Sequence, residues 1–188
     1  MAEPGTLGSV SSFRPFIPWI AILLWWLVRL GTASNLPFEM GITLGVLSHF
    51  ALLISCCLFF VFQRFEDNSL IYRFKTALRP AILYALLASM STVGFHHVVC
   101  AESTAFRKME REQFIERSLA DEEEYAMLQE EDERLAAMDR DTAKQRALEG
   151  LRFQFDPLWH FTASLLMWVA AAMTTSLFTA MTGQWLRG

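Results

Sequence analysis

The sequence predicts an all-α polytopic membrane protein with four transmembrane helices and a charged helical insert between the third and the fourth. The first observation is an apolar run, Gly41–Phe62, that contains no Asp, Glu, Lys or Arg. As a helix this run is about 33 Å long, enough to cross a hydrocarbon core of about 30 Å. The second observation is that 16 of the 20 acidic residues fall between Ala101 and Asp156, which leaves the rest of the chain very apolar.

Composition excludes several classes of protein. The 188 residues are 53% hydrophobic and 19% charged, against about 25% charged in soluble domains. The net charge of −4 arises in the charged segment and offers no basic face for nucleic acid. The three cysteines, of which Cys56 and Cys57 are adjacent in an apolar run, do not form a disulfide framework.

The chain divides into four parts. These are a flexible N-terminal tail over 1–15, the first three transmembrane helices over 16–100, an acidic extramembrane insert over 101–156, and the fourth helix with a short tail over 157–188. The spans themselves are expected at Phe16–Leu30, Gly41–Phe62, Pro80–Val99 and Pro157–Met181. Proline suits the first turn of a helix, and Asp156 provides an N-cap before the last span.

The first span has two features with structural consequences. Arg29, near its far end, is expected to snorkel toward the membrane surface, whereas Trp25 and Trp26 are expected to face lipid. The short apolar core and the small residues Gly31–Ala33 also resemble the end of a signal peptide, which stays open as an alternative.

The polar turn Gln63–Arg79 sets the expected orientation. It carries four basic residues, and short basic loops favour the cytoplasmic side of a membrane. We therefore expect both termini in the cytoplasm and the insert outside.

The insert is expected to be helical because it is rich in Ala, Leu, Glu and Arg and has no proline before Pro157. Ser118–Asp121 is expected to cap a helix that reaches Met138, and Asp141 to begin another. A partial apolar stripe favours a hairpin that packs on itself or on the bundle. A docking surface for another chain is the alternative, with Phe106, Phe114, Tyr125, Leu128 and Leu135 as its residues.

Small residues at helical spacing predict close packing between spans. They are Gly41 and Gly45 in the second span, Ala81, Ala85 and Ser89 in the third, and Ala172, Ser176 and Ala180 in the fourth. Such faces fit a compact bundle, or a bundle together with a contact between subunits.

The four histidines, His49, His96, His97 and His160, are expected to lie toward the insert side of the membrane. Imidazoles on facing helices can hold haem or a transition metal, and intramembrane polar groups can also form a proton path. No metal-binding spacing such as HExxH or CxxC occurs. We therefore favour hydrogen bonding between helices or at the interface, with no cofactor, and keep the two other interpretations as alternatives.

The segment FKTALRPAILYALLASMSTVGF (Phe74–Phe95), the long charged insert and the small-residue last span with its polar tail carry a resemblance. From Gly41 to its C-terminus the chain resembles a bacterial family of four-span membrane proteins of unknown function. The resemblance implies a four-span fold in the bacterial inner membrane. It carries no functional residues.

These observations lead to three hypotheses about function. The sequence contains no GxSxG, P-loop or GxGxxG motif, which favours a non-enzymatic accessory or scaffolding subunit of a larger membrane complex. Its expected partners are the lipid bilayer and either other membrane-protein subunits or further copies of itself. The alternatives are a haem- or metal-binding four-helix protein and an oligomeric conduit for ions or solutes.

Overall fold

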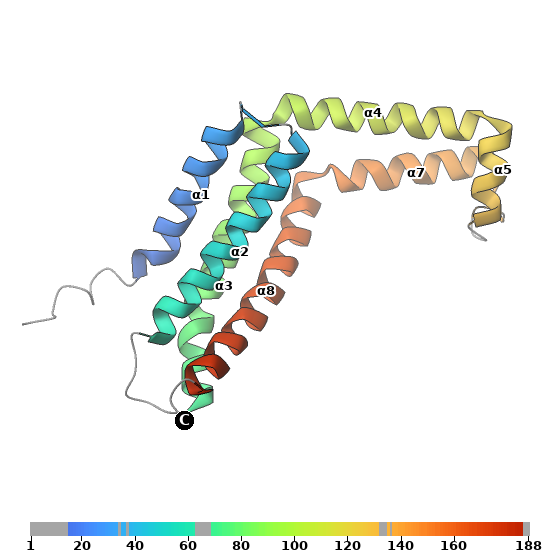
Figure 1. Cartoon of the computed structure of the whole chain (residues 1–188). Coiled ribbons are helices and arrows are strands. Elements are labelled where there is room, and N and C mark those ends of the chain that lie inside the picture. The colour runs from blue at the N-terminus through green and yellow to red at the C-terminus, as the bar shows by residue number, and fades with distance from the viewer. Residues whose placement is uncertain are drawn as a thin grey trace, which may run out of the picture. The chain divides into compact units, whose positions relative to one another are not determined.

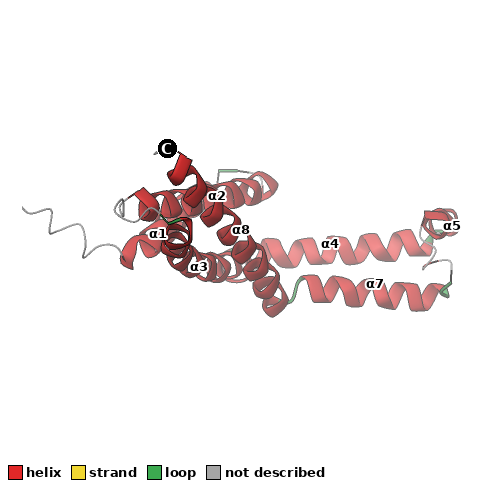
Figure 2. Cartoon of the chain, turned by 90° about the horizontal axis from the view of Figure 1, so that it is seen from below, coloured by secondary structure: helices red, strands yellow, loops and turns green. Residues whose placement is uncertain are grey.

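A computed structural model of the chain describes residues 15–33, 35–36, 38–62, 69–131, 135 and 137–185. Every described element is a helix, so the predicted all-α fold is confirmed for this part of the chain (Figures 1 and 2). The predicted N-terminal tail, apart from residue 15, and residues 186–188 lie outside the described residues.

Three of the described helices are long and apolar enough to cross a membrane. They are α2 (Phe38–Phe62), α3 (Leu70–Gly94), which continues into the π-helical turn η2 (Phe95–Val99), and α8 (Pro157–Trp185). Helix α1 (Ile17–Ala33) is also apolar but has only 17 residues, which makes it about 26 Å long. The structure thus supports an integral membrane protein with three full-length candidate spans and one shorter apolar helix.

The chain forms two compact units. Unit 1 comprises Met1–Ser91 and Ser164–Gly188, and unit 2 comprises Thr92–Ala163. Helices α3 and α8 each run from one unit into the other. Within unit 1, α2, α3 and α8 lie side by side (Figure 1), and α1 packs on α2.

The core of unit 1 combines small side chains with a few large ones. The small residues predicted to line the spans are all buried, namely Gly41, Gly45, Ala81, Ala85, Ser89, Ala172, Ser176 and Ala180. The large side chains Trp168, Tyr84 and Leu53 are also fully buried. Because alanine and serine let helices approach closely, Cys57 Sγ on α2 comes within 3.7 Å of Ser176 Oγ on α8.

Helix α3 begins at Leu70, ten residues before the predicted start at Pro80. Ser69 caps it, because its Oγ accepts a hydrogen bond from the backbone N–H of Tyr72 at 3.2 Å. Pro80 therefore lies inside the helix, where its missing N–H removes one backbone hydrogen bond. The buried Arg73 and Ala77 extend the inward-facing stripe back by two turns, and this packing offsets the proline. Residues 70–79 of the predicted turn are therefore helical, and residues 63–68 lie outside the described residues.

Helix α1 is oriented differently from the prediction. Trp25 is 2% exposed and Arg29 is 3% exposed, so both side chains are buried within unit 1 and do not face outward as predicted. The Arg29 guanidinium donates a hydrogen bond to the Gly41 carbonyl of α2, and Trp25 Nε1 donates to the Gly45 carbonyl at 3.0 Å. The opposite face of α1 is exposed and apolar, and carries Trp19, Ile20, Leu23, Leu24, Leu27, Val28 and Leu30.

Unit 2 is built on a helical hairpin. Helices α4 (Ala101–Ala120) and α7 (Arg140–Gln154) lie side by side, and α5 (Glu122–Glu131) follows α4 (Figure 2). Lys144 Nζ on α7 forms an ion pair with Glu116 Oε1 on α4 at 3.3 Å. The Arg140 side chain donates to the Leu119 carbonyl near the end of α4.

Two predicted helix starts in this unit are wrong. Ser118 lies inside α4 and is buried, whereas Asp121 caps α5 by accepting hydrogen bonds from the N–H groups of Glu123 and Glu124. Asp139, not Asp141, caps α7, because its side chain accepts from the Thr142 N–H at 2.9 Å. An Asp in the first turn and an Asp at the N-cap differ by two positions, and composition does not distinguish them.

Candidate functional site

The structure assigns the four histidines to different units. His49 belongs to unit 1, whereas His96, His97 and His160 belong to unit 2. The interpretation that they form a common cofactor site stays a prediction. Two polar clusters must therefore be considered separately.

His49 lies in a fully buried aromatic cluster between α1, α2, α3 and α8. Its Nδ1 is 2.8 Å from the hydroxyl of Tyr84. Its ring stacks on Trp25 with centroids 4.3 Å apart and planes inclined by 15°, and it meets the edge of Trp168 at 5.1 Å. One imidazole thus connects all four helices of unit 1.

Two nitrogens in this cluster lack hydrogen-bond partners. Within the described part of the chain, neither His49 Nε2 nor Trp168 Nε1 has a hydrogen-bond partner, although both side chains are 1% exposed. A buried polar atom left unpaired costs about 1–3 kcal/mol. The hydrogen bond to Tyr84 and the stacking on Trp25 offset part of this free-energy cost and fix the orientation of the imidazole.

Arg29 adds a positive charge to the same region of unit 1. Its guanidinium carbon lies 5.9 Å from the centre of the Trp25 ring. A Cβ built on Gly41 would come within 3.0 Å of the Arg29 guanidinium, and one on Gly45 within 3.1 Å of its Nε. The predicted GxxxG motif of α2 therefore accommodates the arginine side chain of α1. Charged side chains at such positions in membrane spans are commonly functional.

The second cluster lies where α3 ends and α8 begins, within unit 2. His97 Nε2 on η2 is 3.2 Å from His160 Nδ1 on α8, and the His96 and His160 ring centres are 5.3 Å apart. In the His97–His160 contact one nitrogen donates and the other accepts, so the bond cannot persist with both imidazoles doubly protonated. The π-helical turn brings two consecutive histidines toward the same partner, and such turns occur frequently at functional sites.

The described residues provide no complete set of metal ligands. Nowhere among them do three His, Cys, Asp or Glu side chains come together in a way that could hold a metal ion. In both clusters an imidazole nitrogen that could bind metal is hydrogen-bonded to Tyr84 or to another histidine.

The predicted docking residues of the insert separate into two groups. Phe106 and Phe114 on α4 are 55% and 65% exposed. Tyr125, Leu128 and Leu135 are half-buried, and the Tyr125 hydroxyl donates to the Met138 carbonyl at 3.3 Å. The first group is free to contact another surface, whereas the second contributes to the fold of the hairpin tip.

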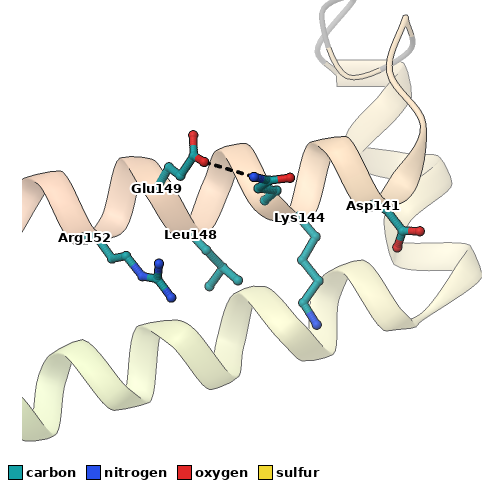
Figure 3. Close-up of a pocket in the computed structure, with 6 residues that line it drawn as sticks. Asp141, Lys144, Leu148, Glu149 and Arg152 are labelled. Atoms are coloured by element: carbon teal, nitrogen blue, oxygen red, sulfur yellow. Dashed lines mark hydrogen bonds between the residues drawn. The ribbon is translucent and has the colours of Figure 1, made fainter.

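A shallow groove runs along α7 beside α4, lined by Asp141, Lys144, Gln145, Leu148, Glu149 and Arg152 (Figure 3). Gln145 Nε2 donates to Glu149 Oε1 at 3.2 Å, and Lys144 is bound to Glu116 across the hairpin. Lys144 thus takes part in the contact between α4 and α7, whereas Gln145 and Glu149 are paired with each other along α7. We therefore do not assign this groove as a ligand site.

Sequence reasoning missed several members of the buried cluster, among them Arg29, Trp25, Tyr84 and Trp168. One available signal is spacing, because Trp25 and Arg29 lie one helical turn apart and face a GxxxG motif. Another is a tyrosine in the middle of an apolar span, where its hydroxyl needs a partner.

No protein-family model, no curated protein and no solved structure matches this chain. The resemblance to a bacterial four-span family accordingly stays a prediction.

Proposed function

We propose that the chain is a non-enzymatic integral membrane subunit that crosses the bilayer four times and presents the α4–α7 hairpin to a partner in a larger complex. The observation that carries this proposal is the pairing of a well-braced hairpin with exposed aromatic side chains. The hairpin is held by an ion pair and by the contact of Arg140 with Leu119. It nevertheless leaves the aromatic side chains of Phe106 and Phe114 on α4 55% and 65% exposed.

The fourth crossing in this proposal is α1. At about 26 Å it is a few ångströms shorter than an average hydrocarbon core. A mismatch of this size costs only fractions of a kcal/mol per ångström and is met by local thinning of the bilayer. The lipid-facing apolar side of α1 and the exposed Trp19 at its start fit a crossing with an interfacial anchor.

The two alternative functions receive less support. A conduit through one chain needs a polar, water-filled axis, but the interior of unit 1 is filled by Trp168, Tyr84 and Leu53. A haem or metal site needs imidazole nitrogens that are available, whereas His97 and His160 are bonded to each other. A conduit between several copies of the chain would also use the small-residue faces, so the oligomeric state belongs in the test.

Photo-crosslinking in native membranes tests the proposal. A photoreactive phenylalanine analogue replaces Phe114 in one variant and Gln145, an exposed polar residue of α7, in the matched control. We expect a discrete crosslinked partner from position 114 and none from position 145. Purification as a lone monomer in mild detergent, without a crosslink at either position, would contradict the proposal.

A further inference from the structure

We infer that the hairpin root, defined as residues 98–111 and 144–159, is a binding surface for the anionic headgroups of membrane lipids. This inference needs α3 and α8 to be membrane spans but does not depend on the proposed protein partner. It assigns the part of the hairpin nearest to the spans to lipid and leaves the distal part for other contacts.

Chain continuity places the root at the membrane surface. The candidate span of α3 and η2 ends at Val99 and α4 begins at Ala101, whereas α7 ends at Gln154 and the α8 span begins at Pro157. The first turns of α4 and the last turns of α7 therefore lie within a few residues of the hydrocarbon boundary. The headgroup region there is several ångströms deep on each side of the bilayer.

Exposed apolar side chains gather at this level of unit 2. They are Val98, Val99, Phe106, Met109, Phe153, Leu158 and Trp159, each between 38% and 76% exposed. Phe153 and Trp159 lie with ring centres 4.2 Å apart and join the end of α7 to the start of α8. Trp and other aromatic residues are enriched where a membrane meets water, so lipid is a suitable environment for this surface.

The distribution of charge along the hairpin also favours binding of anionic lipid headgroups at the root. The root carries six basic and four acidic residues, whereas residues 118–143 carry ten acidic and two basic ones. Among these root residues, Asp156 caps α8 by accepting from the Trp159 N–H, and Lys144 is paired with Glu116 on α4. An anionic bilayer therefore attracts the root and repels the acidic distal part of the hairpin, residues 118–143.

Three basic residues, Arg107, Lys108 and Arg111, lie in the second and third turns of α4. Each basic residue near an anionic membrane surface strengthens binding about fivefold at moderate ionic strength. Phe106 precedes these basic residues and Met109 lies among them in the sequence. At helical spacing both apolar side chains point to the opposite face of α4, so this stretch of helix has a basic face and an apolar face. Such a combination is typical of interfacial helices.

Hydrogen exchange of the full chain in lipid nanodiscs tests this inference. The chain is reconstituted into phosphatidylcholine alone and into phosphatidylcholine with phosphatidylglycerol. In the anionic discs we expect exchange over residues 101–111 to slow by about 25-fold, because two basic contacts of about fivefold each stabilise the closed helix. Exchange over α5 should stay unchanged, and added salt should reverse the effect.

Two charge variants sharpen the test. Arg107→Gln, Lys108→Gln and Arg111→Gln are combined in one variant, and Glu122→Gln, Glu123→Gln and Glu124→Gln in the control. The first variant should lose the difference between the two lipid compositions, and the control should keep it. Circular dichroism checks that both retain their helix content. Equal exchange of the unaltered chain in both discs, or a lipid effect that survives in the first variant, would overturn the inference.

Discussion

The side chain of Arg29 on α1 packs against Gly41 and Gly45 of α2, and this contact explains why small residues are needed at both positions. Burying a charged side chain costs free energy, and here the arginine is buried against Gly41 and Gly45, which have no side chains to block it. The guanidinium contacts the Gly41 carbonyl and lies near the ring of Trp25. The GxxxG spacing thus fits a polar side chain between two helices as well as their close approach.

Replacing Gly45 with valine should therefore destabilise unit 1. The new Cβ would lie 3.1 Å from Arg29 Nε and 3.2 Å from its Cδ, so the arginine would have to move. Overpacking of this kind costs about 1–3 kcal/mol, which we expect to see as a lower midpoint of thermal unfolding in detergent. Gly31→Val is the matched control, because no atom lies within 4 Å of a Cβ built there. Equal midpoints for the two variants would show that Gly45 does not seat the arginine.

Helix boundaries show what the sequence can and cannot predict at the scale of elements. The apolar helices could be predicted because length and hydrophobicity are summed over many residues. Their starts could not, because local rules compete with tertiary packing: Pro80 favours a helix start, yet the buried Arg73 and Ala77 continue the packed face beyond it. The hydrogen-bond partner of His49 could not be predicted either, because Tyr84 lies on another helix and only tertiary packing brings the two side chains together.

The cap of α7 provides a prediction at this scale. Hydrogen bonds from the Thr142 side chain, and then from the Thr142 backbone, lower the pKa of the Asp139 carboxyl. A carboxyl with a lowered pKa stabilises the folded state above its unfolded pKa, and this contribution is lost as the pH falls through the folded pKa. Asp139→Ala should therefore lower the protection of amides in the first turn of α7 against exchange at neutral pH. It should also remove the loss of that protection on acidification, with protection taken relative to intrinsic exchange at each pH.

Asp141→Ala is the control for this prediction, because Asp141 lies in the first turn of α7 but is not its N-cap. It should leave exchange at residues 140–143 close to that of the unaltered chain. If both substitutions had the same effect, the negative charge near the helix start would matter and the specific cap would not.

The membrane topology of the whole molecule depends on whether α1 crosses the bilayer, because this crossing decides on which side the start of the chain lies relative to the later loops. Labelling of single cysteines with an impermeant maleimide in intact cells distinguishes three crossings from four. The native Cys56, Cys57 and Cys100 are first replaced by serine or alanine. Each of four exposed positions is then changed to cysteine in turn, namely Phe16, Asn35, Ser69 and Gln113.

With four crossings, Phe16→Cys and Ser69→Cys share one side of the membrane, whereas Asn35→Cys and Gln113→Cys share the other. The reason is that α1 separates the first and second positions, α2 the second and third, and α3 the third and fourth. If α1 only lies on the surface, positions 16 and 35 label from the same side. Positions 69 and 113 still label from opposite sides, because α3 separates them. That outcome would leave three crossings and place the start of α1 on the same side as the hairpin. The buried Arg29 makes four crossings the expected result, because its contact with the Gly41 carbonyl requires α1 to run against the start of α2.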